Sequence, residues 1–310
     1  MAKVEIFCEW NSHYIRRRMK NQRKAYLFAL SAVLCWSTIG SAMKLSLRYI
    51  DVIQLLLLAN LVAVIVLFLI LVFQHKLPLL QGLRLRDWAS SAVLGLLNPF
   101  LYYVVLLMAY DLLKAQEAGT LNYIWPLVLV LLSIPMLKQK ISGWSFIAIM
   151  ISFSGLLVIS TQGDVLGLTF SSPLGVLLAV GSAIFWALYW ILNMKDPRED
   201  VSKLFLNFCF GFVYILAFYI FRGDFLIPGW EGIAGSVYLG IFEMGLTFIL
   251  WLKALKYSGN TAKVSNLIFL SPFISLIIIR YTVGETILLS TVIGLLLIIF
   301  GILMQRYLRK

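Results

Sequence analysis

Long apolar runs separated by short polar joins dominate this chain. The runs are close to the ~20 residues that an α-helix needs to cross the hydrocarbon core of a bilayer. None of the joins is long enough to hold a soluble domain. The pattern therefore predicts an all-α membrane protein with ten transmembrane helices, at residues 25–43, 50–73, 87–110, 115–137, 142–161, 173–194, 201–221, 229–254, 260–282 and 286–304.

The two halves of the chain repeat each other. Pro126 and Pro272 align without a gap, and the same 146-residue offset places Gln139 on Glu285. The same offset pairs Gly155 with Gly301, and Trp36 and Trp186 start the two halves in similar local sequences, Leu-Cys-Trp-Ser and Ile-Phe-Trp-Ala. Each half has five predicted spans, so the second half enters the membrane from the opposite side. The sequence thus predicts two inverted five-helix repeats around a central cavity, an arrangement typical of secondary transporters. The predicted repeats are residues 25–161 and 173–304.

The distribution of Lys and Arg predicts the orientation. If the N-terminus is cytoplasmic, 21 of the 26 basic residues fall in cytoplasmic segments and 5 on the other side. Basic residues are enriched on the cytoplasmic side of membrane proteins. We therefore expect a multi-pass protein of the cytoplasmic membrane with both termini in the cytoplasm, as a basic extension at residues 1–24 and a tail at residues 305–310. Met19 resembles a natural start, so residues 1–18 are expected to have no fold of their own.

Composition agrees with this class. The chain is 61% hydrophobic and 13% charged, whereas soluble domains have ~25% charged residues. The positive-inside bias and attraction to anionic lipid headgroups explain the net charge of +12, so this charge gives no reason to expect nucleic-acid binding. The expected partners are a small-molecule substrate and membrane lipid. The sequence does not distinguish a monomer from a dimer.

Signatures of catalysis and metal binding are absent from the sequence. The three cysteines show no CxxC spacing, and His13 and His75 lie far apart. No P-loop, GxSxG, HExxH or dinucleotide-binding fingerprint occurs. We therefore expect no cofactor, no metal, no catalytic residue and no enzymatic activity. Pumping driven by ATP hydrolysis within this chain is not expected either.

Glu243 is the strongest candidate for a functional residue. It lies near the middle of the eighth predicted span, where an ionisable side chain is costly and usually has a function. Ser236, Gly240, Glu243 and Thr247 follow one another at positions i, i+4, i+7 and i+11, so they share one helix face. This face is expected to look into a cavity or onto a neighbouring helix. The alternative is that Glu243 is protonated and only joins two helices through a hydrogen bond.

Prolines and aromatic residues gather near mid-membrane. Pro99, Pro126 and Pro272 are expected to kink their helices, and backbone groups freed inside a membrane need protein or a cavity around them. Kinks at one depth fit a binding chamber, although prolines also occur in transmembrane helices without a role. Aromatic rings with a polar edge suit an amphipathic solute. The candidate substrate-binding residues are Trp36, Asn98, Tyr102, Asn122, Tyr123, Trp125, Trp186, Tyr189, Glu243 and Asn266.

Several short motifs carry a resemblance to a known family. They are Leu34-Cys35-Trp36-Ser37-Thr38, Ala254-Leu255-Lys256-Tyr257, Leu270-Ser271-Pro272, Gly284-Glu285, and Gly294 with Gly301. With these motifs, residues 19–306 resemble the drug/metabolite transporter superfamily, in its ten-helix EamA branch.

Three further motifs are most similar to the aromatic-amino-acid exporter subgroup of that branch. They are Glu117-Ala118-Gly119, Asn122-Tyr123-Ile124-Trp125-Pro126 and Phe185-Trp186-Ala187-Leu188-Tyr189. The resemblance implies a ten-helix basket with a central cavity, lined by Tyr123, Trp125 and Trp186, that exports amino acids or related metabolites. Lys138-Gln139-Lys140 departs from the family's usual Gly-Glu, which weakens any catalytic role for that position.

The expected function is therefore export of amino acids or related small amphipathic metabolites by a secondary carrier that works by alternating access. A broad exporter of lipophilic cations, with Glu243 as the counter-charge, is the alternative within transport. A membrane-embedded enzyme would need a cluster of acids, histidines or a nucleophile at one depth, and only Glu243 is central. A lipid-handling protein would need a lateral opening, which sequence does not show. Proton coupling and facilitated diffusion both stay open.

Overall fold

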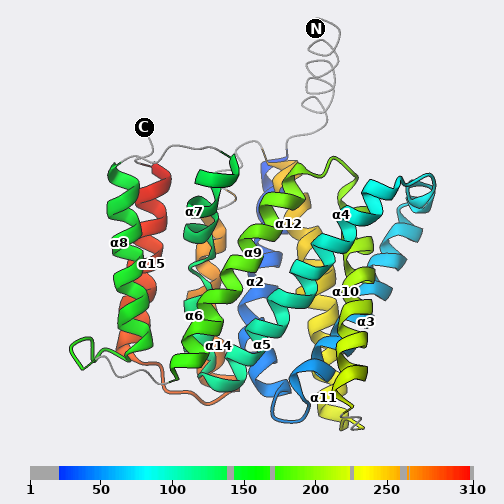
Figure 1. Cartoon of the computed structure of the whole chain (residues 1–310). Helices are drawn as coiled ribbons and strands as arrows, with labels where there is room; N and C mark the ends of the chain where they lie inside the picture. The colour runs from blue at the N-terminus through cyan, green and yellow to red at the C-terminus, as the bar shows by residue number, and fades with distance from the viewer. Residues whose placement is uncertain are drawn as a thin grey trace, which may run out of the picture.

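The computed structural model describes residues 21–137, 143–167, 172–223, 227–258, 264 and 266–307 (Figure 1). Every regular element in these residues is a helix, and no β-strand occurs among them. Most of the predicted N-terminal extension and the last three residues of the predicted tail lie outside the described residues. The predicted all-α class is confirmed.

The helices follow the predicted spans in order. They are α2 (Gln22–Ser46), α3 (Val52–Phe73), η1 (Leu77–Leu80), α4 (Leu85–Gly95), η2 (Leu96–Leu101), α5 (Tyr102–Leu112), α6 (Ala115–Asn122), α7 (Trp125–Leu137), α8 (Gly143–Ser160), α9 (Pro173–Lys195), α10 (Asp200–Arg222), α11 (Trp230–Leu239), η3 (Gly240–Gly245), α12 (Leu246–Tyr257), η4 (Asn266–Phe269), α14 (Leu270–Thr282) and α15 (Leu289–Tyr307).

Seven helical stretches in the described residues are long and apolar enough to cross a membrane. They are Gln22–Ser46, Val52–Phe73, Leu85–Leu112, Ala115–Met136, Pro173–Asn193, Asp200–Arg222 and Trp230–Ala254. Three further apolar helices are shorter, at Ile147–Ser160, Leu267–Thr282 and Leu289–Met304. Each of the ten predicted ranges overlaps one of these stretches, in order.

Four predicted spans are interrupted, and three of them are the spans in which prolines predicted a kink. In the third span, Pro99 lies in the π-helical turn η2 and Asn98 has non-helical dihedrals, φ −149° and ψ 118°. In the eighth, the π-helical turn η3 carries Glu243 between two glycines. The fourth span breaks between α6 and α7, and the ninth begins with the 3₁₀ turn η4. Pro126 and Pro272 fall in the first turns of α7 and α14, where a missing N–H leaves no helical bond unmade.

The helices pack in pairs drawn from the two halves of the chain. Helix α2 packs on α12 and α14, and α9 packs on α5 and α7. Helix α3 lies against α10, and α8 lies against α15 (Figure 1). In the α8–α15 pair, Gly155 approaches the backbone of Gly294, and Gly301 approaches that of Ala148. Small residues at these points let the two backbones come close, which is how membrane helices commonly associate.

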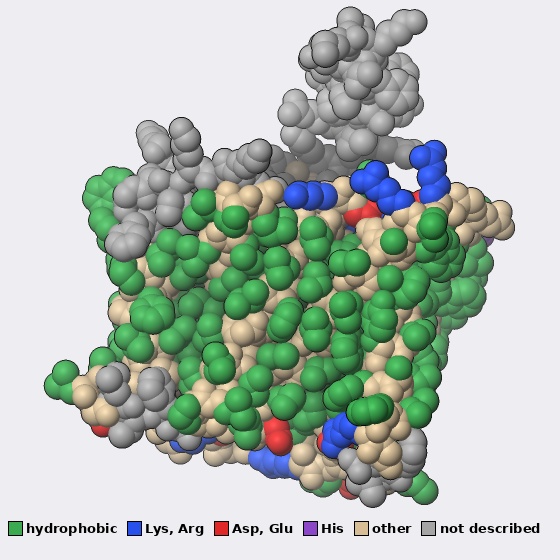
Figure 2. All heavy atoms as spheres, viewed as in Figure 1, with side chains coloured by type: hydrophobic (Ala, Val, Ile, Leu, Met, Phe, Trp, Pro, Cys, Tyr) green, Lys and Arg blue, Asp and Glu red, His purple; other side chains and the backbone are tan. Residues whose placement is uncertain are grey.

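The surface is apolar around its middle. In Figure 2, hydrophobic side chains cover the centre of the visible face, and the described acidic and basic side chains lie at its upper and lower edges. Large apolar side chains such as Phe73, Leu177 and Phe221 are mostly exposed. Soluble monomers rarely expose apolar surface on this scale, whereas a bilayer covers it. The structure is that of an integral membrane protein.

The bundle has two distinct ends. Helix α2 starts, and α15 ends, on the same side of the bundle, at the top of Figure 1. We call this the terminus side. The other side, where α2 and α14 end, is called the opposite side. The charge bias of the sequence predicts that the terminus side faces the cytoplasm.

Candidate functional site

A cavity of about 150 Å³ lies among α2, α5, α6, α9, α12 and α14, next to the interruptions in the helices. The structure brings seven of the ten predicted site residues together in its lining. They are Trp36, Tyr102, Asn122, Tyr123, Trp125, Trp186 and Glu243. These residues come from both halves of the chain.

Glu243 lies in the wall of this cavity on η3, with its side chain buried. The Tyr103 hydroxyl donates a hydrogen bond to Glu243 Oε1 at 2.9 Å. Oε2 is buried and has no hydrogen-bond partner among the described residues. Ser236, Gly240 and Thr247 are buried too, so the predicted face is turned away from lipid. The bond to Tyr103 joins two helices, as the structural alternative expects, and it leaves one carboxylate oxygen without a donor.

Trp186 is the centre of an aromatic cluster in the cavity wall. Its ring centroid lies 4.6 Å from that of Tyr102 and 5.8 Å from that of Trp190. Trp36 pairs with Trp251 at 5.4 Å. Trp190 and Trp251 also line the cavity, although the sequence pattern did not single them out. Trp190 could have been found, because it follows Trp186 by four residues and so shares its helix face.

Polar side chains meet at the break between α6 and α7. The Asn122 amide donates to Ser182 Oγ at 2.8 Å and accepts from the Tyr102 hydroxyl at 3.4 Å. The Tyr123 hydroxyl donates to the carbonyl oxygen of Ile268 at 2.6 Å. That carbonyl belongs to η4, so Tyr123 satisfies a backbone group in the interrupted ninth span. A membrane interior tolerates irregular backbone only where such partners exist.

Asn98 and Tyr189 do not line the cavity. Asn98 is fully buried, and neither polar atom of its side chain has a hydrogen-bond partner in the described structure. Its neighbour Pro99 packs against Gly211 of α10, so the break in the third span lies against that helix. Tyr189 stacks behind Trp186, with ring centroids 6.1 Å apart.

Two positions singled out by the sequence cannot be placed against the cavity. The side chain of Asn266 lies outside the described residues, although its backbone begins η4. Gln139, which the repeat aligns with Glu285, lies outside them as well.

Glu285 fixes the start of α6 at the opposite side. Its carboxylate accepts from the backbone N–H groups of Ala115, at 2.7 Å, and Gln116, at 3.2 Å. The Gln116 side chain in turn donates to the carbonyl of Thr286 at 2.8 Å and accepts from the N–H of Leu288 at 3.0 Å. A carboxylate at a helix start satisfies free N–H groups and opposes the helix dipole. The α14–α15 connection therefore positions the cavity-lining residue Gln116.

The cavity extends from the middle of the bundle toward the opposite side. Its lining includes Met43, Tyr110 and Ile279, which lie near the ends of α2, α5 and α14 on that side. Toward the terminus side the lining includes Trp190 and Trp251. The aromatic rings thus stand between the cavity and the terminus side.

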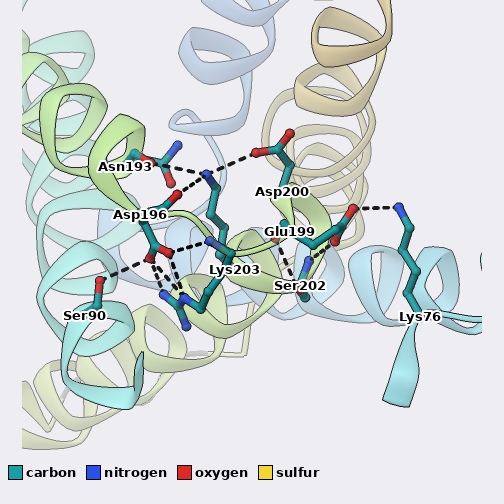
Figure 3. Close-up of polar contacts among 9 residues, drawn as sticks. Lys76, Ser90, Asn193, Asp196, Glu199, Asp200, Ser202 and Lys203 are labelled. Atoms are coloured by element: carbon teal, nitrogen blue, oxygen red, sulfur yellow. Dashed lines mark hydrogen bonds and ion pairs between the residues drawn. The ribbon is translucent and has the colours of Figure 1, made fainter. Parts of the chain in front are cut away.

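Ion pairs join two connections at the terminus side (Figure 3). Lys76 Nζ lies 2.6 Å from Glu199 Oε1, linking the segment after α3 to the start of α10. Arg198 pairs with Asp196 at 2.6 Å. The Ser90 hydroxyl of α4 donates to Asp196 Oδ2 at 3.2 Å. The connection between α9 and α10 is thereby tied to the α3–α4 region.

These contacts lower the pKa values of the two carboxyl groups. Burial alone would raise the pKa of Asp196, but hydrogen bonds and the charge of Arg198 outweigh it and hold that pKa below its usual range. Lys76 and nearby backbone N–H groups outweigh burial for the pKa of Glu199 in the same way. A carboxyl group whose pKa is lowered by folding stabilises the fold at pH values above its ordinary pKa of about 4. This contribution is lost as the pH falls through the lower pKa of the folded state. Both ion pairs are therefore intact at neutral pH.

Comparisons with known proteins agree with this architecture. The profile of the EamA-like transporter family matches residues 23–161 and again residues 173–306. An "Uncharacterized transporter" of Clostridium kluyveri is 26% identical over 287 residues, which cover 90% of this chain and 92% of that protein. The "Uncharacterized transporter YvbV" of Bacillus subtilis is 28% identical over 231 residues, covering 73% and 74%. A solved crystal structure matches with a TM-score of 0.66 at 20% identity, over 93% of this chain and 98% of that one, which shows a shared fold.

Proposed function

This chain belongs to the EamA-like transporter family, within the drug/metabolite transporter superfamily, and from that premise we propose that it exports amino acids or related small amphipathic metabolites across the cytoplasmic membrane. The transporter works by alternating access and without ATP hydrolysis of its own. Family membership supports transport as such. The lining of the cavity supports the class of solute.

The observation that carries the proposal is a cavity at the helix breaks that combines aromatic rings with one buried carboxylate. Trp36, Tyr102, Trp125 and Trp186 offer apolar faces and polar edges, and Glu243 offers a charge. Ligand sites are typically apolar pockets with a few placed polar groups. An amphipathic solute with an aromatic or aliphatic body suits this lining. Such a lining is also what the resemblance to the aromatic-amino-acid exporters implies.

Contacts between α8 and α15 support two inverted repeats. Under the 146-residue offset, Gly155 corresponds to Gly301 and Ala148 corresponds to Gly294. The approach of Gly155 to Gly294 then has its counterpart in the approach of Gly301 to Ala148. A two-fold axis in the plane of the membrane, as in inverted-repeat transporters, would produce such paired contacts.

Helix packing supports the same symmetry. Helix α2 contacts α12 and α14 as α9 contacts α5 and α7, and the π-helical turns η2 and η3 interrupt corresponding spans. Ser152 and Ile298 are themselves equivalent, and Ser152 Oγ donates to the Ile298 carbonyl at 3.3 Å. Two halves that can exchange their conformations provide a mechanism for alternating access. A cavity that reaches the opposite side would, after the exchange, reach the terminus side.

A transport screen tests the function. Inside-out membrane vesicles containing the protein are given labelled amino acids and related amines and acids, with and without a pH gradient. If the termini are cytoplasmic, export appears as uptake into these vesicles. We expect uptake of at least one solute above that of vesicles lacking the protein. Dependence on the pH gradient would favour proton coupling, and independence would favour facilitated diffusion. Uptake equal to the control for the whole panel would contradict the proposal.

A further inference from the structure

We propose that the cavity recognises its solute through a protonated amine, held between the Glu243 carboxylate and the faces of aromatic rings, and that the solute needs no carboxylate. This inference rests on the proposed transport function, because it assigns the solute class of the same cavity. It distinguishes amines and other organic cations from amino acids, which carry both charges.

The charges around the cavity favour a cation. Glu243 is the one acidic or basic side chain that lines it in the part of the chain that the structure describes. Lys44 lies close to the opposite end, but its Nζ donates to the backbone carbonyls of Tyr110, Asp111 and Leu113 at 2.6, 3.3 and 2.7 Å. These carbonyls lie at the end of α5, where a Lys is favourably placed. Its ammonium group is thus committed to the protein backbone, and a solute carboxylate finds no basic side chain in the described lining.

One oxygen of the Glu243 carboxylate has no hydrogen-bond donor in the described structure. The Tyr103 hydroxyl occupies Oε1 at 2.9 Å, whereas Oε2 is buried without a donor in the described structure. A buried acceptor that lacks a donor is costly. An ammonium N–H would satisfy it with a charge-assisted hydrogen bond, which is stronger than one between neutral groups. The same contact would neutralise a charge that is expensive inside a membrane.

The rings of the cavity wall supply the second half of the site. Tyr102, Trp186 and Trp190 line the cavity together with Glu243. The ring centroid of Trp186 lies 4.6 Å from that of Tyr102 and 5.8 Å from that of Trp190. A cation within about 6 Å of an aromatic centroid is attracted to the ring face, most strongly for Trp. Several rings around one carboxylate are the pattern by which proteins bind organic ammonium groups. Leu106 in the lining offers an apolar contact for the body of the solute.

The start of α7 is the feature that could instead bind a carboxylate. Trp125 lines the cavity at this point, and free N–H groups at a helix start attract anions. Pro126 follows in the same turn and has no N–H to contribute. If a carboxylate did bind there, a zwitterion would bind more tightly than the matching amine. A comparison of matched ligands separates the two cases.

The test uses three probes with the same phenyl group and chain length. They are 2-phenylethylamine, phenylalanine and 3-phenylpropanoate. Their dissociation constants are measured by quenching of tryptophan fluorescence in the full-length protein, purified into nanodiscs. Because one charge-assisted contact is at stake, we expect the amine to bind about 10- to 100-fold more tightly than the acid. We expect phenylalanine to bind no more tightly than the amine.

Two variants tie the effect to Glu243. Glu243→Gln should weaken binding of the amine about 10- to 100-fold and leave the weak binding of the acid nearly unchanged. Glu231→Gln is the matched control, because Glu231 is exposed in the first turn of α11, and it should bind the amine normally. If Glu243→Gln does not fold, the three probes on the unmodified protein still decide.

The outcomes distinguish this inference from the proposed function. Tighter binding of the acid or of phenylalanine, no binding of the amine, or full amine affinity in a folded Glu243→Gln protein would overturn the inference. Transport of an acid or zwitterion in vesicles would then keep the transport function. Amine binding that depends on Glu243, with no transport of any solute, would keep the amine site and remove the transport function.

Discussion

Glu243→Gln is expected to reduce the rate of transport about 10-fold or more, while the protein still folds and inserts. Glutamine keeps the size of the side chain and can still accept a hydrogen bond from Tyr103. It loses the charge, so it can neither make a charge-assisted contact with solute nor bind and release a proton. The measurement is the initial rate of uptake into vesicles that contain equal amounts of correctly folded protein.

The alternative role of Glu243 as a joint between helices makes the opposite prediction. If the side chain only bonds Tyr103, the glutamine variant should transport normally. Glu243→Leu should then weaken helix association by only ~0.6–2 kcal/mol. Glu231→Gln again serves as the control and should transport at the normal rate. A normal rate for folded Glu243→Gln protein would assign Glu243 to helix packing and would leave the cavity without its charged contact.

Trp186→Ala is expected to abolish solute binding and to destabilise the protein. The ring is 8% exposed and packs against the rings of Tyr102, Trp190 and Phe248. Removal of a buried Trp side chain costs ~3–5 kcal/mol in protein cores, and membrane helices depend on the same close packing. Trp186→Phe keeps an aromatic face and should retain part of both properties. Thermal unfolding and the transport rate measure the two effects separately.

Trp230→Ala is the matched control for this prediction. Trp230 begins α11 and is 74% exposed, so its removal should change neither the cavity nor the core. A Trp186→Ala protein with the unfolding temperature and transport rate of the Trp230→Ala protein would show that the aromatic cluster does not form the binding wall.

Much of the architecture could be predicted because it depends on local sequence. A run of ~20 apolar residues identifies a span wherever it occurs, and an acid within such a run is conspicuous, which is why Glu243 was found. Tyr123 and Trp125 were found because they stand beside Pro126, where a helix break was expected, and Trp36 was found because the repeat matches it with Trp186. Seven of the ten predicted site residues line one cavity for these reasons.

The features that were missed depend on contacts between distant segments. Tyr103 bonds Glu243 across 140 residues, and nothing near Tyr103 in the sequence indicates its partner. The proline after Asn98 shows that the helix breaks there, but the close approach of Pro99 to Gly211 decides which way the break packs. Asn98 therefore lies against α10 and away from the cavity.

Solute is expected to cross the membrane through this cavity by alternating access. Ser275 lines the cavity on α14, so a cysteine at this position reports which side the cavity opens to. The variant Ser275→Cys is made in a protein whose native cysteines, Cys8, Cys35 and Cys209, are replaced by serine. A membrane-impermeant thiol reagent is then applied to oriented vesicles from each side, with and without a transported solute.

Alternating access predicts that Cys at position 275 reacts from the opposite side and also from the terminus side, and that solute changes the ratio of the two rates. Reaction from one side only, under every condition, would contradict alternating access through this cavity.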